Sequence, residues 1–429
     1  MIITLHRPHQ IGGCITVIES GRTKIIIDFG SNLPGTKKKE LGQRQINSIT
    51  KNTDAIFFTH YHGDHTGLIH KIPDSIPLYM GMGAKEVMEC KFDTLKRAAA
   101  YHDGKESKQY TEQANSLAAV QRMLTFKEDE RINVADKGEI FVTPYFVSHS
   151  AFDAYMFLIE AEGKRILHTG DFRGHGYLSK GLWGTLRKYV KQVDLLITEG
   201  TMLSRSSEKV PHEVEIKRKA IDFLTKGGQN NHYMVLCSST DIDRLASFHK
   251  ACTETGAKFM VDSYQKRVLD IFTKYAGAKS DLYDFTETLV KGCNYDTELL
   301  PYGFIIPVRA NDKKFIQAFK HGYCKDVKLI YSMWKGYIEG SENQLNPELV
   351  YIVQKLFKGK YEYLHTSGHA DMETLARVCR YTKPRIGVIS IHHDPEVVFS
   401  DQIKTGFRVI DENTDLSTYG IEYRELNYD

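Results

Sequence analysis

Short apolar runs separated by polar turns dominate the first third of the chain and predict β-strands. The runs "CITVIES" (14–20) and "KIIIDFG" (24–30) are separated by "GRT", which is typical of a hairpin, and "DAIFFTH" (54–60) follows. Strand patterns return in "EIFVTPYFVSH" (139–149) and in "AYMFLIEAEGKRILHTGD" (154–171), whose internal glycine predicts a second hairpin. This part of the chain is therefore expected to consist mainly of strands, with a hairpin at each of these two turns.

Other stretches carry apolar residues at helical spacing. Residues 83–124 have them three and four positions apart, and Gly104 predicts a break between two helices. From about residue 208, helical and strand patterns alternate, which predicts β-α-β units with a parallel sheet. An insertion within a split first domain explains this order, so we expect domain parts at 1–207 and 359–429 and an inserted domain at 208–358.

Residue types that bind metals follow the predicted strands repeatedly. Seven apolar strand candidates each end on a histidine or a carboxylate: Asp28, the group from His60 to His65, His149, Asp171, Glu199, His369 and His392. In layered α/β folds, ligands bind beyond the carboxyl ends of strands. The sequence therefore predicts that these side chains converge on one rim.

The string "HYHGDH" (60–65) is the densest of these groups. Histidine and aspartate are ligands that zinc prefers, and alternate side chains leaving a strand can point the same way. Asp64 and His65 stand at the start of a predicted short helix. Four candidate ligands here, with more downstream, exceed what one tetrahedral ion needs, so two ions that share Asp171 are the simplest arrangement.

A purely structural explanation is available for each residue alone. A single histidine at a strand end is usually structural, and Asp28 in "DFG" is also typical of a turn. With 18 histidines in 429 residues, however, the whole string would arise by chance on the order of once in several hundred chains. The string as a whole therefore indicates a metal site.

Composition and charge exclude several classes of protein. Apolar residues at 41% and charged residues at 26% are typical of a globular protein. The seven cysteines are scattered and form no C-x-x-C pair, so we expect neither a disulfide framework nor a cysteine-based zinc finger. We find no export signal and no apolar run of roughly 18 residues, so we expect a cytoplasmic protein without a membrane partner. The net charge of +3 permits a polyanionic substrate without requiring one.

With these residues assembled, the chain resembles the metallo-β-lactamase superfamily, and within it the β-CASP nucleases, the family of ribonuclease J, the pre-mRNA 3′-end endonuclease and Artemis. Asp28 matches motif 1; His60, His62, Asp64 and His65 match motif 2; His149 matches motif 3 and Asp171 motif 4; Glu199 in "ITEGT" matches motif A, His369 in "HTSGHAD" motif B and His392 in "SIHHD" motif C. The inserted block stands between motifs A and B, where that family carries its cap domain.

The resemblance implies a fold, cofactors and an activity. The fold would be α/β, a metallo-β-lactamase αββα sandwich with an inserted β-CASP α/β cap. Two divalent ions, zinc first and manganese as the alternative, would hold a bridging hydroxide that attacks phosphorus. One ion would be bound by His60, His62, His149 and Asp171, and the other by Asp64, His65, Asp171 and His392. Asp28 would hold a ligand histidine or the bridging water.

The resemblance also assigns roles on the leaving-group side. His369 would be the general acid, oriented by the carboxylate of Glu199. Catalytic roles are thus expected for Asp28, Asp64, Glu199 and His369. The residues themselves, and not the resemblance, suggest phosphate contacts from Ser367 and His365 near motif B, and from Ser238, Ser239 and Arg244 at a strand-to-helix turn of the cap. Serines at helix starts are ordinarily caps, and the cap segment "CSSTDIDR" matches the phosphate loops of the family poorly.

Some features depart from the family pattern or leave alternatives open. Gly200 stands where motif A usually has serine or threonine, and His393 is an alternative ligand to His392. Lys37 to Lys39 would contact a nucleic-acid backbone or form a solvated loop. RNA is the expected substrate, with DNA, a thioester or a small phosphodiester as alternatives, as is an inactive scaffold that binds nucleic acid or protein. A homodimer is a family expectation, and the cleavage mode, endo or exo, stays open.

Overall fold

The protein is described here from a computed structural model, which defines residues 1–36, 38–228, 231–404 and 406–428. Two compact units divide the chain: unit 1 comprises 1–174, 178–208 and 368–429, and unit 2 comprises 175–177 and 209–367. Apart from the short segment 175–177, the chain passes from unit 1 to unit 2 after residue 208, beside the predicted boundary at 207, whereas unit 2 extends to Ser367, beyond the predicted 358. Their assignment as a split domain with an inserted cap stays a prediction.

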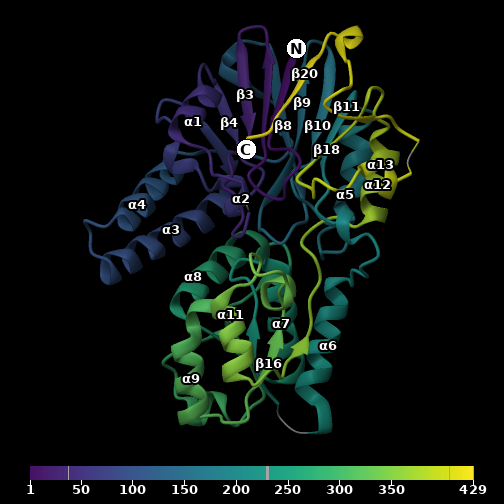
Figure 1. The fold of residues 1–429 in the computed structure, drawn as a ribbon. Coiled ribbons are helices and arrows are strands. Elements are labelled where there is room, and N and C mark those ends of the chain that lie inside the picture. Colours follow the sequence, from purple (N-terminus) through teal and green to yellow (C-terminus); the bar gives the residue numbers. More distant parts are fainter. Residues whose placement is uncertain (37, 229–230, 405, 429) are drawn as a thin grey trace. The chain divides into compact units, whose positions relative to one another are not determined.

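Unit 1 contains two sheets that face each other (Figure 1). The first runs in the order β20 (Glu422–Leu426), β1 (Ile2–His6), β2 (Ile15–Ser20), β3 (Thr23–Ile27), β4 (Ala55–Phe57), β5 (Leu78–Gly81) and β6 (Leu124–Phe126). The second runs in the order β19 (Val409–Ile410), β18 (Gly387–Ile391), β11 (Leu195–Glu199), β10 (Lys164–His168), β9 (Ala154–Ala161), β8 (Ile140–Val147) and β7 (Ile132–Asn133). Both predicted hairpins are confirmed, as β2–β3 and β9–β10 pair antiparallel.

Apolar side chains from both sheets form the core between them, among them Ile25, Phe57, Phe157 and Ile197. Helices cover the outer faces: α1 (Gln43–Thr50), α2 (Gly63–Thr66), α3 (Met82–His102) and α4 (Lys108–Gln121) belong to the side of the first sheet, and α5 (Lys180–Thr185), α12 (Met372–Thr382) and α13 (Phe399–Gln402) to that of the second. The predicted α/β sandwich is confirmed, and so is the helix break at Gly104, which has a φ of 82°.

Unit 2 is built on one sheet in which the recorded strand pairs are all parallel, as the alternation of strands and helices predicts. Its order is β14 (Leu289–Val290), β13 (Lys258–Val261), β15 (Phe304–Val308), β12 (His232–Leu236), β16 (Lys328–Tyr331) and β17 (Glu362–Tyr363). Its helices are α6 (Glu213–Thr225), α7 (Ile242–Thr255), α8 (Ser263–Phe272), α9 (Lys313–Gly322), α10 (Gly336–Glu339) and α11 (Pro347–Tyr351). Within the described residues, no helix of either unit is long and apolar enough to cross a membrane.

The last strand of unit 1, β20, is held in its sheet by pairing with β1 and by an ion pair between Glu425 and His9. His9 Nε2 lies 2.6 Å from the Glu425 carboxylate, and His9 Nδ1 lies 3.1 Å from His393 Nε2. His393 Nδ1 donates to the Asp394 carbonyl, so its Nε2 must accept a proton from His9. His9 therefore carries protons on both nitrogens, and its bond to Glu425 raises its pKa above the ordinary 6.5.

This ion pair predicts a pH-dependent contribution to stability. Because the folded pKa of His9 is raised, the stabilisation is fully present below the unfolded pKa and is lost as the pH rises through the folded pKa. Glu425→Gln should lower the free energy of unfolding by roughly 0.5–1 kcal/mol near pH 6 and by much less near pH 9. Urea titrations at both values measure the difference. Glu422 is on the same strand but is paired with Arg424. Glu422→Gln should therefore change the free energy of unfolding by the same amount at both pH values.

Candidate metal centre

Two predicted site residues sit in left-handed backbone directly after strands. Asp28 follows β3 with a φ of 60°, and His392 follows β18 with a φ of 56°. Such a conformation costs roughly 1–3 kcal/mol outside glycine, and functional sites are among the places where proteins accept this cost. Backbone hydrogen bonds hold it, from Asp28 to the Phe57 carbonyl at 2.9 Å and from His392 to the Pro8 carbonyl at 2.8 Å.

Asp28 orients two histidines of the "HYHGDH" string. The Nδ1 atom of His65 lies 2.8 Å from Asp28 Oδ2 and donates to it. The Thr59 hydroxyl donates to the same carboxylate at 2.8 Å and therefore accepts from His60 Nδ1 at 3.0 Å. With both Nδ1 atoms bound, the Nε2 atoms of His60 and His65 are turned towards the site. Burial alone would lower the pKa of His65, but the Asp171 and Asp28 carboxylates raise it well above 6.5.

A cluster of imidazoles forms the first group of candidate ligands. His149 Nδ1 donates to the Gly368 carbonyl at 2.6 Å, which turns its Nε2 towards His62 Nδ1 at 3.1 Å. Ligand atoms of His60, His62 and His149 lie within 4.8 Å of one another. Burial lowers the pKa of all three, that of His62 to about 4, so these rings are neutral at pH 7. His60 Nε2 is buried and has no hydrogen-bond partner within the part of the chain that the structure describes.

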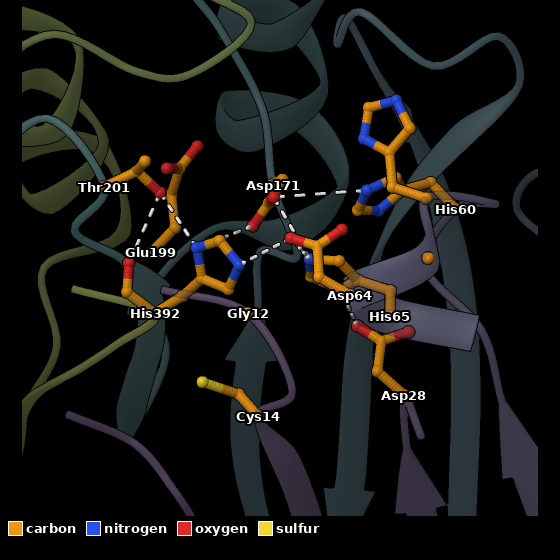
Figure 2. A network of polar contacts seen from close by, with 12 residues as sticks. Gly12, Cys14, Asp28, His60, Asp64, His65, Asp171, Glu199, Thr201 and His392 are labelled. Carbon is orange, nitrogen blue, oxygen red and sulfur yellow. Dashed lines mark hydrogen bonds and ion pairs between the residues drawn. The ribbon is translucent and has the colours of Figure 1, made fainter. Parts of the chain in front are cut away.

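A second group combines two carboxylates with two histidines (Figure 2). Asp171 Oδ2 lies 3.1 Å from His65 Nε2 and 4.0 Å from His60 Nε2, so it faces both groups. Asp64 Oδ2 lies 3.2 Å from His392 Nε2. Although burial opposes ionisation, the neighbouring histidines hold the pKa of both carboxylates below the usual range. Both therefore stay anionic at neutral pH.

The geometry favours His392 over His393 as the ligand. Both ring nitrogens of His393 are bound away from the cluster, to His9 and to the Asp394 carbonyl. His392 directs Nε2 to Asp64, and its Nδ1 lies 2.9 Å from the Thr201 hydroxyl. A Cβ at Gly200 would lie 2.5 Å from Leu203 Cδ1 and 2.8 Å from Ser390 Oγ, so a serine or threonine there would require these side chains to shift. Thr201 supplies the hydroxyl one position later.

Glu199 and His369 lie beside the second group and, with Asp171, form a third cluster of possible ligand atoms. His369 Nδ1 is 2.9 Å from Glu199 Oε2 and 3.6 Å from Asp171 Oδ2. The other Glu199 oxygen accepts backbone N–H groups of Phe172 and Ala370. Burial alone would lower the pKa of His369, but the Glu199 and Asp171 carboxylates raise it above 6.5. The expectation that a strand ends at His369 is wrong, because β17 stops at Tyr363 and a loop leads from it to α12.

The donor set fits divalent cations. Neutral imidazoles with fixed Nδ1–H bonds, anionic carboxylates and an unpartnered buried Nε2 are what zinc or manganese sites use. The structure thus contains His/Asp clusters that are able to bind metal ions.

The predicted phosphate contacts all lie in unit 2 and engage protein partners there. Arg244 is 1% exposed, and its guanidinium binds Glu213, Ser332, the Thr366 carbonyl and His365 Nδ1. The Ser367 carbonyl accepts from His175, and the side chain of Ser238 and the carbonyl of Ser239 bond within or beside the turn before α7. These contacts place Arg244 in the interior of unit 2, and the phosphate roles stay predictions.

The sequence analysis did not identify several groups that orient the candidate ligands. The hydroxyls of Thr59 and Thr201 and the carbonyl of Gly368 bond to ligand histidines. None of these three residues has a sequence signature. Gly30 is needed for space, since a Cβ there would lie 1.6 Å from the Asp64 carbonyl oxygen. Of the lysine run, Lys37 lies outside the described residues, and Lys39 is exposed.

Comparisons with known proteins identify what the chain is similar to. A family profile described as the metallo-β-lactamase superfamily matches residues 12–198. Ribonuclease J of Helicobacter pylori strain J99 is 25% identical over 406 residues, which cover 88% of this chain and 53% of the relative. Ribonuclease J of strain 26695 is 24% identical over 402 residues with the same coverage. The chain spans about half the length of the curated relatives it matches.

A solved structure shares the fold. The crystal structure of a protein of unknown function from Enterococcus faecalis V583 superimposes with a TM-score of 0.67 at 17% identity, covering 96% of this chain and 98% of that one. At this identity the likeness concerns the fold alone. Together with the profile match, it confirms the fold that the motifs indicate.

Proposed function

We propose that this chain, whose residues 12–198 match the metallo-β-lactamase profile, is a metal-dependent ribonuclease of the β-CASP type that hydrolyses phosphodiester bonds in RNA. The observation that carries this proposal is the Glu199–His369 pair beside Asp171. A general acid next to the metal ligands suits a reaction with a poor alkoxide leaving group. The similarity to ribonuclease J points to RNA as the substrate.

Two divalent ions would be held by His60, His62, His149, Asp64, His65, Asp171 and His392, with Asp171 facing both. When bound, they would supply a nucleophile at neutral pH and positive charge for the phosphate.

The chain's own residues perform the remaining work. Asp28 holds the rings of His65 and, through Thr59, of His60 with their Nε2 atoms towards the site. Glu199 binds His369 Nδ1 and fixes the ring, so that a proton on Nε2 would pass to the leaving oxygen. The backbone N–H groups of Phe172 and Ala370 donate to Glu199 and hold its carboxylate in place.

Cleavage of labelled nucleic acid tests the proposed function. The purified protein is incubated with 5′-labelled single-stranded RNA and DNA, with Zn²⁺, Mn²⁺ or a chelator, and a His369→Ala preparation controls for contaminating nucleases. We expect metal-dependent cleavage of RNA, with a ladder or discrete fragments that distinguish exonuclease from endonuclease action. If the protein binds metal but cleaves neither polymer, the proposal fails. A thioester and a small phosphodiester, tested in parallel, would then separate another hydrolase from an inactive scaffold.

A further inference from the structure

His168, the last residue of β10, has both ring nitrogens bound by groups that are not candidate metal ligands. The Gly170 backbone N–H donates to His168 Nδ1 at 3.2 Å, so the proton of the neutral ring is on Nε2. That Nε2 donates to the Thr16 hydroxyl at 3.1 Å. Thr16 is on β2 of the opposite sheet, so the imidazole links the two sheets of unit 1. Burial lowers the pKa of His168 to about 4, which keeps the ring neutral at pH 7.

The turn that follows His168 is held on several sides. Thr169 donates its backbone N–H to the Ile197 carbonyl at 2.9 Å, and its hydroxyl donates to the Gly170 carbonyl at 2.7 Å. Gly170 has a φ of 55°, and a Cβ there would lie 2.7 Å from the Thr59 Cβ. Thr59 is the residue that holds Asp28 and His60. The peptide before Asp171 thus has little room to move.

The position of His168 puts it directly behind the candidate metal centre. It lines a small enclosed cavity together with Asp28, His65, Asp171 and His392. It is absent from each group of candidate ligands found among the described residues. Its nitrogens are already used, so it acts on the site only through the turn that it holds.

We propose that His168 is a positioning residue for Asp171: by accepting the Gly170 N–H, it fixes the turn that presents the carboxylate facing both candidate ion sites. This inference rests on the proposed function, because it needs the metal centre to exist. The competing explanation is that the His168 ring only fills space between the sheets. The two explanations differ in whether the hydrogen-bond acceptor or the ring volume matters.

Two substitutions separate these explanations. Asparagine at 168 is smaller, but its Oδ1 can accept the Gly170 N–H, as in an Asx turn. Phenylalanine keeps an aromatic ring but offers no acceptor. His168→Asn should bind Zn²⁺ within about threefold of the wild type, whereas His168→Phe and His168→Ala should bind roughly 10–100-fold more weakly.

Zinc affinity is measured by competition with a chromophoric chelator, and the thermal stability of each metal-free protein is measured in EDTA. Wild-type affinity in His168→Phe, or a loss in His168→Asn equal to that in His168→Ala, would overturn the positioning role. If His168→Phe does not fold, the comparison of asparagine with alanine decides. A wild-type protein that binds no zinc would overturn the metal centre itself, and this result is distinct from a failure confined to the His168 variants.

Discussion

Replacement of His369 by alanine is expected to slow RNA cleavage by roughly 10²–10⁴-fold and to leave metal binding intact. The imidazole lies against Glu199 at 2.9 Å and 3.6 Å from Asp171, which places it beside the candidate ligands and outside both proposed ligand sets. Its loss removes the proton donor for the leaving oxygen but no proposed ion ligand. Single-turnover cleavage rates and metal content by mass spectrometry measure the two effects separately.

Two further variants sharpen this prediction. Glu199→Gln keeps a hydrogen-bonding side chain beside His369 but removes the charge that raises its pKa. The protonated acid should then be lost at a lower pH, so the alkaline limb of the pH–rate profile should move towards acid. His102→Ala, at the exposed end of α3, controls for loss of a histidine and should cleave at the wild-type rate. A His369→Ala rate within about threefold of wild type would be incompatible with a general acid.

Local sequence patterns were sufficient to predict the site residues that follow strands. Asp28, His60, His149 and Asp171 each come directly after an apolar run whose strand the structure confirms. Because the ends of neighbouring strands meet at one edge of a sheet, the convergence of these residues could be anticipated. The density of the "HYHGDH" string identified the chemistry.

The sequence could not predict features that depend on contacts between distant segments. β20 pairs with β1 although some 420 residues separate them, and nothing in either segment specifies that partner. His369 is preceded by an apolar-looking run that forms only a two-residue strand, because β17 is an exposed sheet edge. In the sequence, Arg244 has the position of a phosphate ligand at a helix start. In the structure it forms an ion pair with Glu213, which lies on another helix and cannot be recognised as its partner from the sequence.

The hydroxyl and carbonyl groups that bond to the candidate ligands could not be predicted from the sequence either. Thr59, Thr201 and the Gly368 carbonyl fix three ring orientations. Threonine and glycine are common, so their presence near a motif carries little information. Only the three-dimensional positions of the Nδ1 atoms reveal which hydroxyl or carbonyl each of them meets.

Substitution of Asp171 by asparagine is expected to have the largest effect on the metal centre. Its carboxylate lies 3.1 Å from His65 Nε2, 3.9 Å from His392 Nδ1 and 4.0 Å from His60 Nε2, so it serves both groups of candidate ligands. Loss of a group that merely orients a ligand costs roughly 10–100-fold in metal affinity, and a shared anionic ligand should cost more. We expect Asp171→Asn to lose more than about 100-fold in affinity for both ions and to lose detectable cleavage.

Metal stoichiometry distinguishes this shared role from a role in one site. His62→Ala removes a ligand from the imidazole group alone and should leave one ion per chain, whereas Asp171→Asn should leave none at the same metal concentration. Asp153→Asn, whose carboxylate binds backbone N–H groups at the start of α3, is the matched control and should retain both ions. If Asp171→Asn keeps one tightly bound ion, the carboxylate belongs to a single site, and the two ions would have to be held by separate ligand sets.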